Sequence, residues 1–285
     1  MRRGVAVACS IVIAWGAAAA ARTPACDGLG DRELELAERI LDSEYLYACC
    51  DDTISACLAQ QPTCALAARL ADTVCRRVAA GQDEAGIRRA LSRRARSMVG
   101  SGAPADVDLA AAAAVGPEDA PVTVVIYACA RCPYCSRLIP ELHRAVSGGP
   151  LAGDVRLAFR IFPIRGHEGS TEAGLAFAAA DELDAFWPFM LHAYRHFDDF
   201  APGLQPAWAE AVGLDRAAFE ALMADPATRE ALVASKKEGL VNGVEATPTL
   251  FINGRRWVGD LTADELLDAF EEEDERVRGE IWLDD

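Results

Sequence analysis

Positive charge, histidine and long hydrophobic runs are all scarce in this chain of 285 residues. Its 28 lysines and arginines stand against 44 acidic residues, which gives a formal net charge of −16. That balance would repel a phosphate backbone or an anionic membrane surface, so neither is an expected partner. The chain is nevertheless 52% hydrophobic and 25% charged, which excludes a disordered or collagen-like protein.

The acidic charge is unevenly distributed along the chain. Residues 22–100 hold 11 basic and 12 acidic side chains, whereas residues 101–285 hold 15 and 32. The length alone favours about two domains. We therefore expect two differently composed units that join near residue 100.

The first 21 residues have the features of a secretory signal peptide. Arg2 and Arg3 precede an apolar run from Val5 to Ala21 that ends in small residues. An uncleaved anchor is the alternative, because about 17 apolar residues are at the lower limit for a membrane span. Beyond residue 21 no apolar stretch reaches 18 residues, so the mature chain is expected to have no span. The predicted location is periplasmic or secreted, where disulfides are permitted.

Cysteines divide the mature chain in two, and none follows Cys135. Six are crowded into one short segment, where they predict structural disulfides of unknown pairing; these are Cys26, Cys49, Cys50, Cys57, Cys64 and Cys75. In one helix, Cys64 and Cys75 would lie ~16 Å apart along the axis, too far for a bond to each other. A zinc cluster is the competing hypothesis for these cysteines.

Residues 22–99 are expected to form a helical, cysteine-rich domain. A first helix is predicted to start after an Asp31 cap and to run through Tyr45, another to open at Pro62, and a last one to be capped by Asp83. The last helix carries a row of arginines, predicted to be a solvated face or a docking patch for an acidic partner: Arg88, Arg89, Arg93, Arg94 and Arg96. This unit resembles the small three-helix domain of CcmH-like cytochrome c maturation proteins.

The redox-type motif lies beyond a flexible or lightly structured linker at residues 100–120. A β-branched run at residues 122–127 predicts a buried strand, and Cys132-Pro133-Tyr134-Cys135 follows it at the start of a helix. At a helix N-terminus, unpaired N–H groups and the helix dipole stabilise a thiolate. Cys132 is therefore expected to be the exposed, low-pKa thiol. Cys135, one turn later, can resolve a mixed disulfide.

A second motif, Thr247-Pro248, opens a hairpin that turns at Asn253-Gly254. A proline at the start of a central strand is unusual unless it sits at a bend, often as a cis bond. Together with the Cys-Pro-Tyr-Cys run, this arrangement resembles the DsbA-type branch of the thioredoxin superfamily.

The resemblance implies an α/β thioredoxin-like fold at residues 121–275, with a helical insertion at about 169–240 and the all-α domain before it. It implies that Cys132 is the nucleophile and Cys135 the resolving thiol, and that Thr247, cis-Pro248 and Tyr134 shape a substrate groove. The expected function is that of an exported thiol–disulfide oxidoreductase with protein thiol substrates, a redox partner protein and no cofactor. A DsbG-like isomerase or reductase and a non-catalytic, redox-gated binding module are the alternatives.

Several residues near the motifs carry weaker expectations. Family members often have a buried acid at the position of Ile126, so a carboxylate relay is not expected here. Cys129 matches part of an iron–sulfur cluster run, but Ile139 occupies the fourth ligand position. Cys129 lies three residues before Cys132 at the end of the predicted strand, without the helix turn that brings Cys135 close, and it is the odd one among the nine cysteines after residue 21. It is predicted to stand outside turnover. His192 and His196 are expected to pack rather than to bind a metal, and no metal site is predicted. The acidic run 271–275 is expected to be a solvated helix end.

Overall fold

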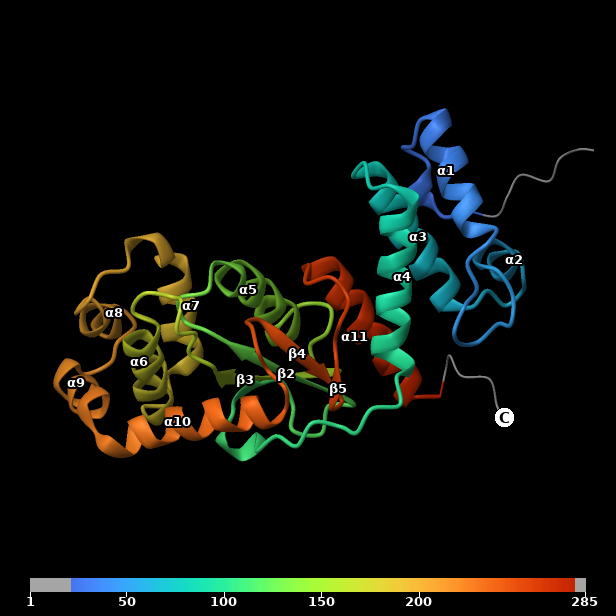
Figure 1. The fold of residues 1–285 in the computed structure, drawn as a ribbon. Coiled ribbons are helices and arrows are strands. Elements are labelled where there is room, and N and C mark those ends of the chain that lie inside the picture. Colours follow the sequence, from blue (N-terminus) through green and yellow to red (C-terminus); the bar gives the residue numbers. More distant parts are fainter. Residues whose placement is uncertain (1–21, 280–285) are drawn as a thin grey trace, which may run out of the picture.

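The computed structural model describes residues 22–279 and consists of a helical unit beside an α/β unit (Figure 1). The predicted signal peptide, residues 1–21, lies outside the described residues. Within residues 22–279, no helix has both the length and the hydrophobicity to cross a membrane. The helical unit contains η1 (Pro24–Cys26), α1 (Asp31–Leu41), α2 (Ile54–Leu58), α3 (Ala65–Ala79) and α4 (Glu84–Val99).

The helix starts differ in part from those expected. Asp31 is the first residue of α1 rather than its cap: the N-cap is Gly30, whose N–H donates to the Glu33 carboxylate over 2.9 Å. The helix ends at Leu41, so Tyr45 lies in the following loop and is 67% exposed. Asp83 does cap α4, accepting a hydrogen bond from the N–H of Gly86. The start of α4 is thus capped by the side chain that the sequence predicted, whereas the start of α1 is capped by a hydrogen bond between Gly30 and Glu33.

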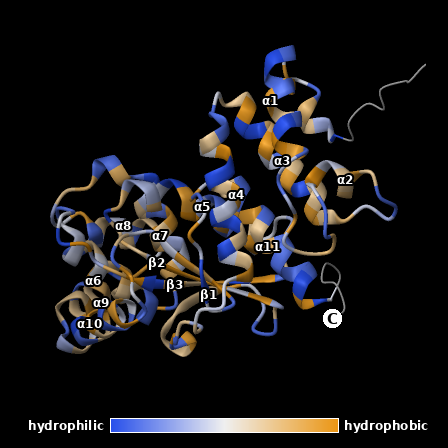
Figure 2. Ribbon diagram, turned by 45° about the vertical axis from the view of Figure 1, so that its right-hand side comes forward, coloured by the Kyte–Doolittle hydropathy of each residue, from blue (hydrophilic) through white to orange (hydrophobic). Residues whose placement is uncertain are grey.

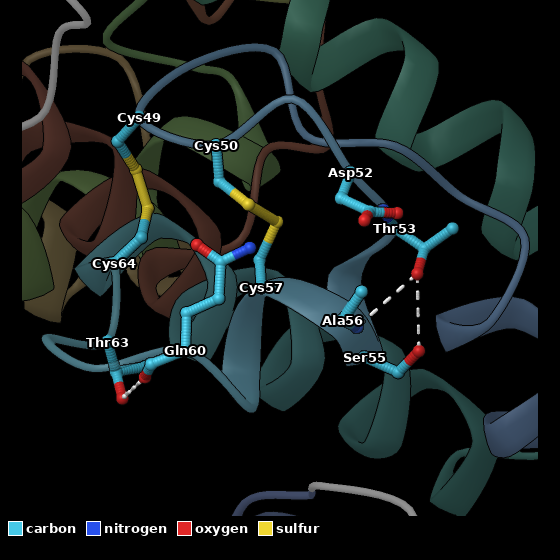
Figure 3. The surroundings of a disulfide bond; sticks show 10 residues. All are labelled: Cys49, Cys50, Asp52, Thr53, Ser55, Ala56, Cys57, Gln60, Thr63 and Cys64. Atoms are coloured by element: carbon cyan, nitrogen blue, oxygen red, sulfur yellow. Dashed lines mark hydrogen bonds between the residues drawn. A yellow bond between two sulfur atoms is a disulfide. The ribbon is translucent and has the colours of Figure 1, made fainter.

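Helix α3 begins at Ala65, three residues after the expected start at Pro62, and Cys64 is its N-cap. All six cysteines of the unit are paired, as Cys26–Cys75, Cys49–Cys64 and Cys50–Cys57. Figure 3 shows how the adjacent Cys49 and Cys50 diverge to two different partners. The bonds join η1, the loop after α1, α2 and α3, and they lie against two small apolar clusters, one with Cys26 and Cys75 and one with Cys50 and Cys57.

The α/β unit is built on a five-stranded sheet in the order β1-β3-β2-β4-β5. Strands β2 (Val122–Ala128) and β3 (Val155–Ile161) are parallel and central, joined by helix α5 (Pro133–Ser147). The other three strands run antiparallel to their neighbours: β1 (Ala113–Val115) pairs with β3, β4 (Thr249–Ile252) with β2, and β5 (Arg255–Arg256) with β4. Figure 2 shows hydrophobic residues concentrated in the central strands, as expected for strands covered on both faces.

Helices cover both faces of the sheet. Helices α5 and α11 (Ala263–Val277) pack against each other (Figure 1). The helical insertion comprises α6 (Ser170–Glu182), α7 (Phe186–Arg195), η3 (Phe197–Asp199), α8 (Gln205–Ala211), α9 (Arg216–Ala224) and α10 (Pro226–Val241). Its bounds agree with the expected insertion at about residues 169–240. The architecture is the thioredoxin-like fold with a helical insertion that the sequence predicted.

The segment expected to be a linker is partly structured. It contains the short helix η2 (Leu109–Ala111) and strand β1, which adds an edge to the sheet. Near the hairpin turn, the N–H of Ala105 donates to the carbonyl of Gly254. The α/β unit therefore takes in residues before position 121, because the sheet edge accepts a strand from the connecting segment.

The two units meet through arginines and carboxylates, which corrects two expectations. Arg94 is completely buried and its guanidinium pairs with Glu272 of α11 over 2.8 Å, so the arginine row is not simply a solvated face. Glu272 and Glu273 are buried too, so the acidic run is not a solvated helix end. Further pairs cross from α3 and α4 to the α/β unit: Arg69–Glu275, Arg76–Asp268, Arg77–Glu265 and Arg93–Asp260. Of the predicted arginine row, Arg93 and Arg94 thus dock on acidic residues of the same chain, whereas Arg89 and Arg96 are exposed.

Candidate active site

The turn between β2 and α5 places Cys132 and Cys135 at the end of a buried strand. Cys132 is the N-cap of α5, and Pro133 occupies the first helical position, where its missing N–H costs no hydrogen bond. Cys135 follows one turn later. Both side chains are buried, at 1% and 0% exposure, so the expectation of an exposed Cys132 thiol is wrong. The adjacent loops cover the sulfur, whereas a short sequence pattern reports only its place on the helix.

The two thiols have opposite acidities. The Cys135 thiol can donate a hydrogen bond to the Cys132 thiolate, and the N–H groups of Cys135 and Tyr134 add to this effect. Together they lower the pKa of Cys132 to about 5, although burial works in the opposite direction. Burial raises the pKa of Cys135 well above its ordinary value, and the neighbouring Cys132 raises it further. At neutral pH the reduced pair therefore holds one thiolate and one thiol.

The loop before β4 lies directly against the nucleophilic sulfur. The peptide bond between Thr247 and Pro248 is cis, as the family resemblance implies. The Cys132 thiol donates to the carbonyl oxygen of Thr247 across 3.3 Å. The Thr247 hydroxyl is buried and has no hydrogen-bond partner among the described residues. It is therefore free to donate to the Cys132 thiolate, and it contributes to the low pKa of that thiol.

Cys129 is also buried, but its surroundings are different. Its sulfur lies 3.1 Å from the Ser170 hydroxyl and 3.3 Å from Nδ1 of His167. Its backbone carbonyl accepts a hydrogen bond from the buried hydroxyl of Tyr194. Ser170 and His167 also line a cavity of about 720 Å³ that none of the three cysteines lines. The N–H of Arg131 also donates to the Cys129 sulfur across 3.4 Å. Cys129 thus has side-chain partners of its own and lies beside, not within, the Cys132–Cys135 pair.

The remaining predicted residues occupy the rim and the base of the site. Tyr134 is 66% exposed, and the Arg137 guanidinium lies over its ring at 5.4 Å from the centroid. Ile126 is fully buried, so no carboxylate occupies that position beneath the cysteines. The nearby acid, Glu238, instead accepts a hydrogen bond from Tyr127 and pairs with Arg160.

Two more residues lie near the cysteines: Tyr194, which had no signal in the sequence, and Arg131, which directly precedes the motif. Tyr194 is completely buried, and its pKa is raised well above its ordinary value by burial and then by the nearby cysteines. Arg131 lies over the rings of Phe197 and Phe200 and donates to the Phe197 carbonyl. A lone tyrosine on a helix gives no pattern, so only the fold could bring Tyr194 to the site; for Arg131 the sequence gives the place beside Cys132 but not the contacts with Phe197 and Phe200.

Histidines and carboxylates do not gather into a metal cluster within residues 22–279. His192 and His196 stack with ring centroids 4.6 Å apart, and both face Trp208. This is the packing role that their spacing and aromatic neighbours predicted.

Solved structures with a similar fold cover most of the α/β unit. Oxidised BdbD from Bacillus subtilis is 22% identical, with a TM-score of 0.53, and the match covers 60% of this chain and 97% of that one. Wolbachia pipientis alpha-DsbA1 is 17% identical, with a TM-score of 0.53, covering 61% and 96%. The catalytic domain of Proteus mirabilis ScsC is 18% identical, with a TM-score of 0.50, covering 66% and 98%. The resemblance to DsbA-type proteins is confirmed at the level of the fold.

Among curated proteins, the Na(+)/H(+) antiporter NhaA 3 of Salinispora tropica is 32% identical over 180 residues, which is 60% of this chain and 27% of that protein. NhaA 1 of Salinispora arenicola is 30% identical over 152 residues, covering 53% and 23%. The chain thus spans about a quarter of the length of these relatives. A family model described as Thioredoxin matches residues 110–272, more than half of the chain. The strand, the two-cysteine helix start and the cis-proline loop all lie within that match, and the chain belongs to the thioredoxin family.

Proposed function

We propose that the protein is an exported thiol–disulfide oxidoreductase that acts on protein thiols through Cys132 and Cys135. The observation that carries the proposal is the opposite shift of the two pKa values, with Cys132 lowered to about 5 and Cys135 raised. A thiolate is the species that attacks and leaves in disulfide exchange, whereas a thiol is inert. At neutral pH, Cys132 is therefore the reactive thiolate and Cys135 the unreactive thiol.

The chemistry follows from this division. In the oxidised enzyme, a substrate thiolate attacks the Cys132 sulfur, and the Cys132–Cys135 bond breaks. The leaving Cys135 sulfur takes up a proton because its pKa is high. A second substrate thiolate then attacks the substrate sulfur of the mixed disulfide, and Cys132 departs as a stable thiolate. The substrate loses two electrons and gains a disulfide, and the enzyme is left as a dithiol.

The low pKa of Cys132 also favours transfer of electrons from the substrate thiols to the enzyme disulfide. Because the thiolate stabilises the reduced enzyme, the enzyme disulfide is the better electron acceptor, which is the property of a DsbA-like oxidant. A redox partner protein that accepts electrons from the dithiol would restore the disulfide. Oxidation of substrates is therefore proposed over reduction or isomerisation, which would need the dithiol to be the working form.

The exposed surface around the pair suits an extended substrate chain. Tyr134 and Pro133 form the exposed start of α5, and the carbonyl of Thr247, directly before Pro248, contacts the Cys132 sulfur. We assign the groove between them to the substrate. Export is supported by the predicted signal at residues 1–21 and by three disulfides in the helical unit, which form in an oxidising compartment such as the periplasm.

Insulin reduction and dithiol-peptide oxidation by the chain from residue 22 onward test the proposal. Wild type should be active in both, Cys132→Ser inactive, and Cys135→Ser should accumulate mixed disulfides with substrate. The reduction potential gives the direction: a value near −120 mV fits an oxidant, and one near −270 mV a reductant. Absence of turnover with an intact Cys132–Cys135 redox cycle would instead indicate a redox-gated binding module.

A further inference from the structure

A basic cavity lies between α5 and α7, beside the redox pair. It has a volume of about 420 Å³. Its walls come from the outer side of α5 and from the end of α7, two helices that pack together (Figure 1). The lining residues are Ser136, Pro140, His143, Arg144, Leu191, Tyr194 and Arg195.

The cavity is positively charged, whereas the protein as a whole is negatively charged. Arg144 and Arg195 are both exposed, and among residues 22–279 neither forms an ion pair with a carboxylate. No acidic residue lines the cavity; Glu141 of α5 is exposed and outside it. Burial lowers the pKa of His143, which leaves its imidazole neutral at pH 7. The positive charge is therefore that of two arginines, in a chain with a net charge of −16.

The cavity is also close to the reacting sulfur. The N–H of Ser136 donates to the carbonyl of Cys132 across 3.0 Å, so the cavity begins one turn along α5 from the nucleophile. Tyr194 separates it from Cys129, whose carbonyl its hydroxyl contacts. At about 1.5 Å per helical residue, Ser136 is ~6 Å and Arg144 ~18 Å along the axis from Cys132. An extended chain covers that span in about two to five residues.

We propose that this cavity binds the carboxylates of an acidic substrate segment, two to five residues from the cysteine that reacts with Cys132. The guanidinium groups of Arg144 and Arg195 can each take a carboxylate in a bidentate pair. Pro140 and Leu191 offer apolar wall to the side-chain stem. This inference rests on the proposed oxidoreductase function, and it adds a substrate preference to it.

The test uses two dithiol peptides that are identical except for Glu or Gln at positions two to five on either side of the cysteine pair. The measured quantity is the Glu-to-Gln ratio of kcat/KM. Two surface ion pairs of ordinary strength predict that the ratio falls about fivefold in the variant Arg144→Gln/Arg195→Gln. The preference of the wild type for the Glu peptide should disappear when the salt concentration is raised from about 0.02 to about 0.5 M, because salt screens exposed ion pairs.

The control variant is Arg32→Gln/Arg229→Gln, which removes the same charge from two exposed arginines outside the cavity. Its ratio should equal that of wild type. Equal ratios in all three proteins, or equal losses in both variants, would overturn the proposal.

A second readout keeps the cavity separate from the redox chemistry. Labelled peptides with Ser in place of Cys cannot react, and their binding is measured by fluorescence anisotropy. The Glu peptide should bind wild type about fivefold more tightly than the cavity variant at low salt. If this difference is found but no peptide is oxidised, the oxidoreductase function fails and the acidic subsite stands. If oxidation proceeds without any such difference, the subsite fails.

Discussion

Arg94 of α4 and Glu272 of α11 form an ion pair of 2.8 Å in which both side chains are buried, although 178 residues separate them in the sequence. The Tyr47 hydroxyl also donates to Glu272, across 2.6 Å. The pair thus joins the helical unit to the last helix of the α/β unit. With Arg69, Arg76, Arg77 and Arg93 around it, it makes the helical unit a docked part of the molecule rather than a tethered one.

Arg94→Met should destabilise the protein strongly, because it leaves the Glu272 carboxylate buried without its cation. Losses of about 3–5 kcal/mol are typical when one partner of a buried pair is removed. Urea unfolding measures the loss. The double variant Arg94→Met/Glu272→Met should recover most of it.

The matched control for this prediction is Arg216→Met. Arg216 pairs with Glu220 at the surface, where both side chains are about half exposed, so the loss in the free energy of unfolding should be much smaller than for Arg94→Met. Equal losses in Arg94→Met and Arg216→Met would contradict the docking role of the buried pair.

The disulfides should differ in their contributions to stability. Cys26–Cys75 closes a sequence separation of 49 residues and Cys50–Cys57 one of 7. A bond that closes a longer loop removes more conformational entropy from the unfolded chain. Removing the first bond should therefore lower the free energy of unfolding by about 4 kcal/mol, and removing the second by about 2 kcal/mol. Thermal unfolding of Cys26→Ala/Cys75→Ala and Cys50→Ala/Cys57→Ala compares them directly. The reverse order would show that local packing, not loop closure, decides the contribution.

The fold was predictable where its pattern is local. The β-branched run of β2, the helix start at Cys132 and the Asn253-Gly254 turn each follow from neighbouring residues. Burial of Arg94 and Glu272 was not predictable, because each lies in a charged helix segment that looks solvated by itself. Only the approach of α4 to α11 supplies each charge with its partner. The same holds for Tyr194 and for the cavity with Arg144 and Arg195, which need two helices to meet.

Cys132 should be alkylated before Cys135 at every pH from about 5 to 8. The pKa of Cys132 is lowered to about 5, whereas that of Cys135 is raised. Iodoacetamide labelling of the protein with its active-site pair reduced, followed by peptide mapping, gives the rate at each sulfur. The rate at Cys132 should rise as the pH passes about 5 and then level off, once the thiol is fully ionised. Labelling that rises only near pH 9 would mean that the helix start and the Cys135 thiol do not stabilise a thiolate.

The same pKa predicts how the stability of the reduced protein depends on pH. In the unfolded chain Cys132 regains its ordinary pKa of 9.0, so between pH 5 and 9 the unfolded state binds more protons than the folded state. Stability should rise with pH through this window, on the order of a few kcal/mol, and be lost as pH falls through about 5. The raised pKa of Cys135 acts only above about pH 9, in the opposite direction. Urea unfolding of the selectively reduced protein, compared with Cys132→Ala, isolates the effect; parallel pH profiles would contradict it.

Cys129→Ser should leave insulin reduction and dithiol oxidation within about twofold of wild type. The Cys129 sulfur lies against Ser170 and His167 and accepts a hydrogen bond from the N–H of Arg131, so its side-chain partners are not the two exchanging thiols. A serine hydroxyl can keep these hydrogen bonds, because it donates and accepts as the thiol does. Cys135→Ser is the comparison, since it removes the resolving thiol. A loss in Cys129→Ser as large as in Cys135→Ser would mean that three cysteines form one relay, and the two-cysteine mechanism would have to be abandoned.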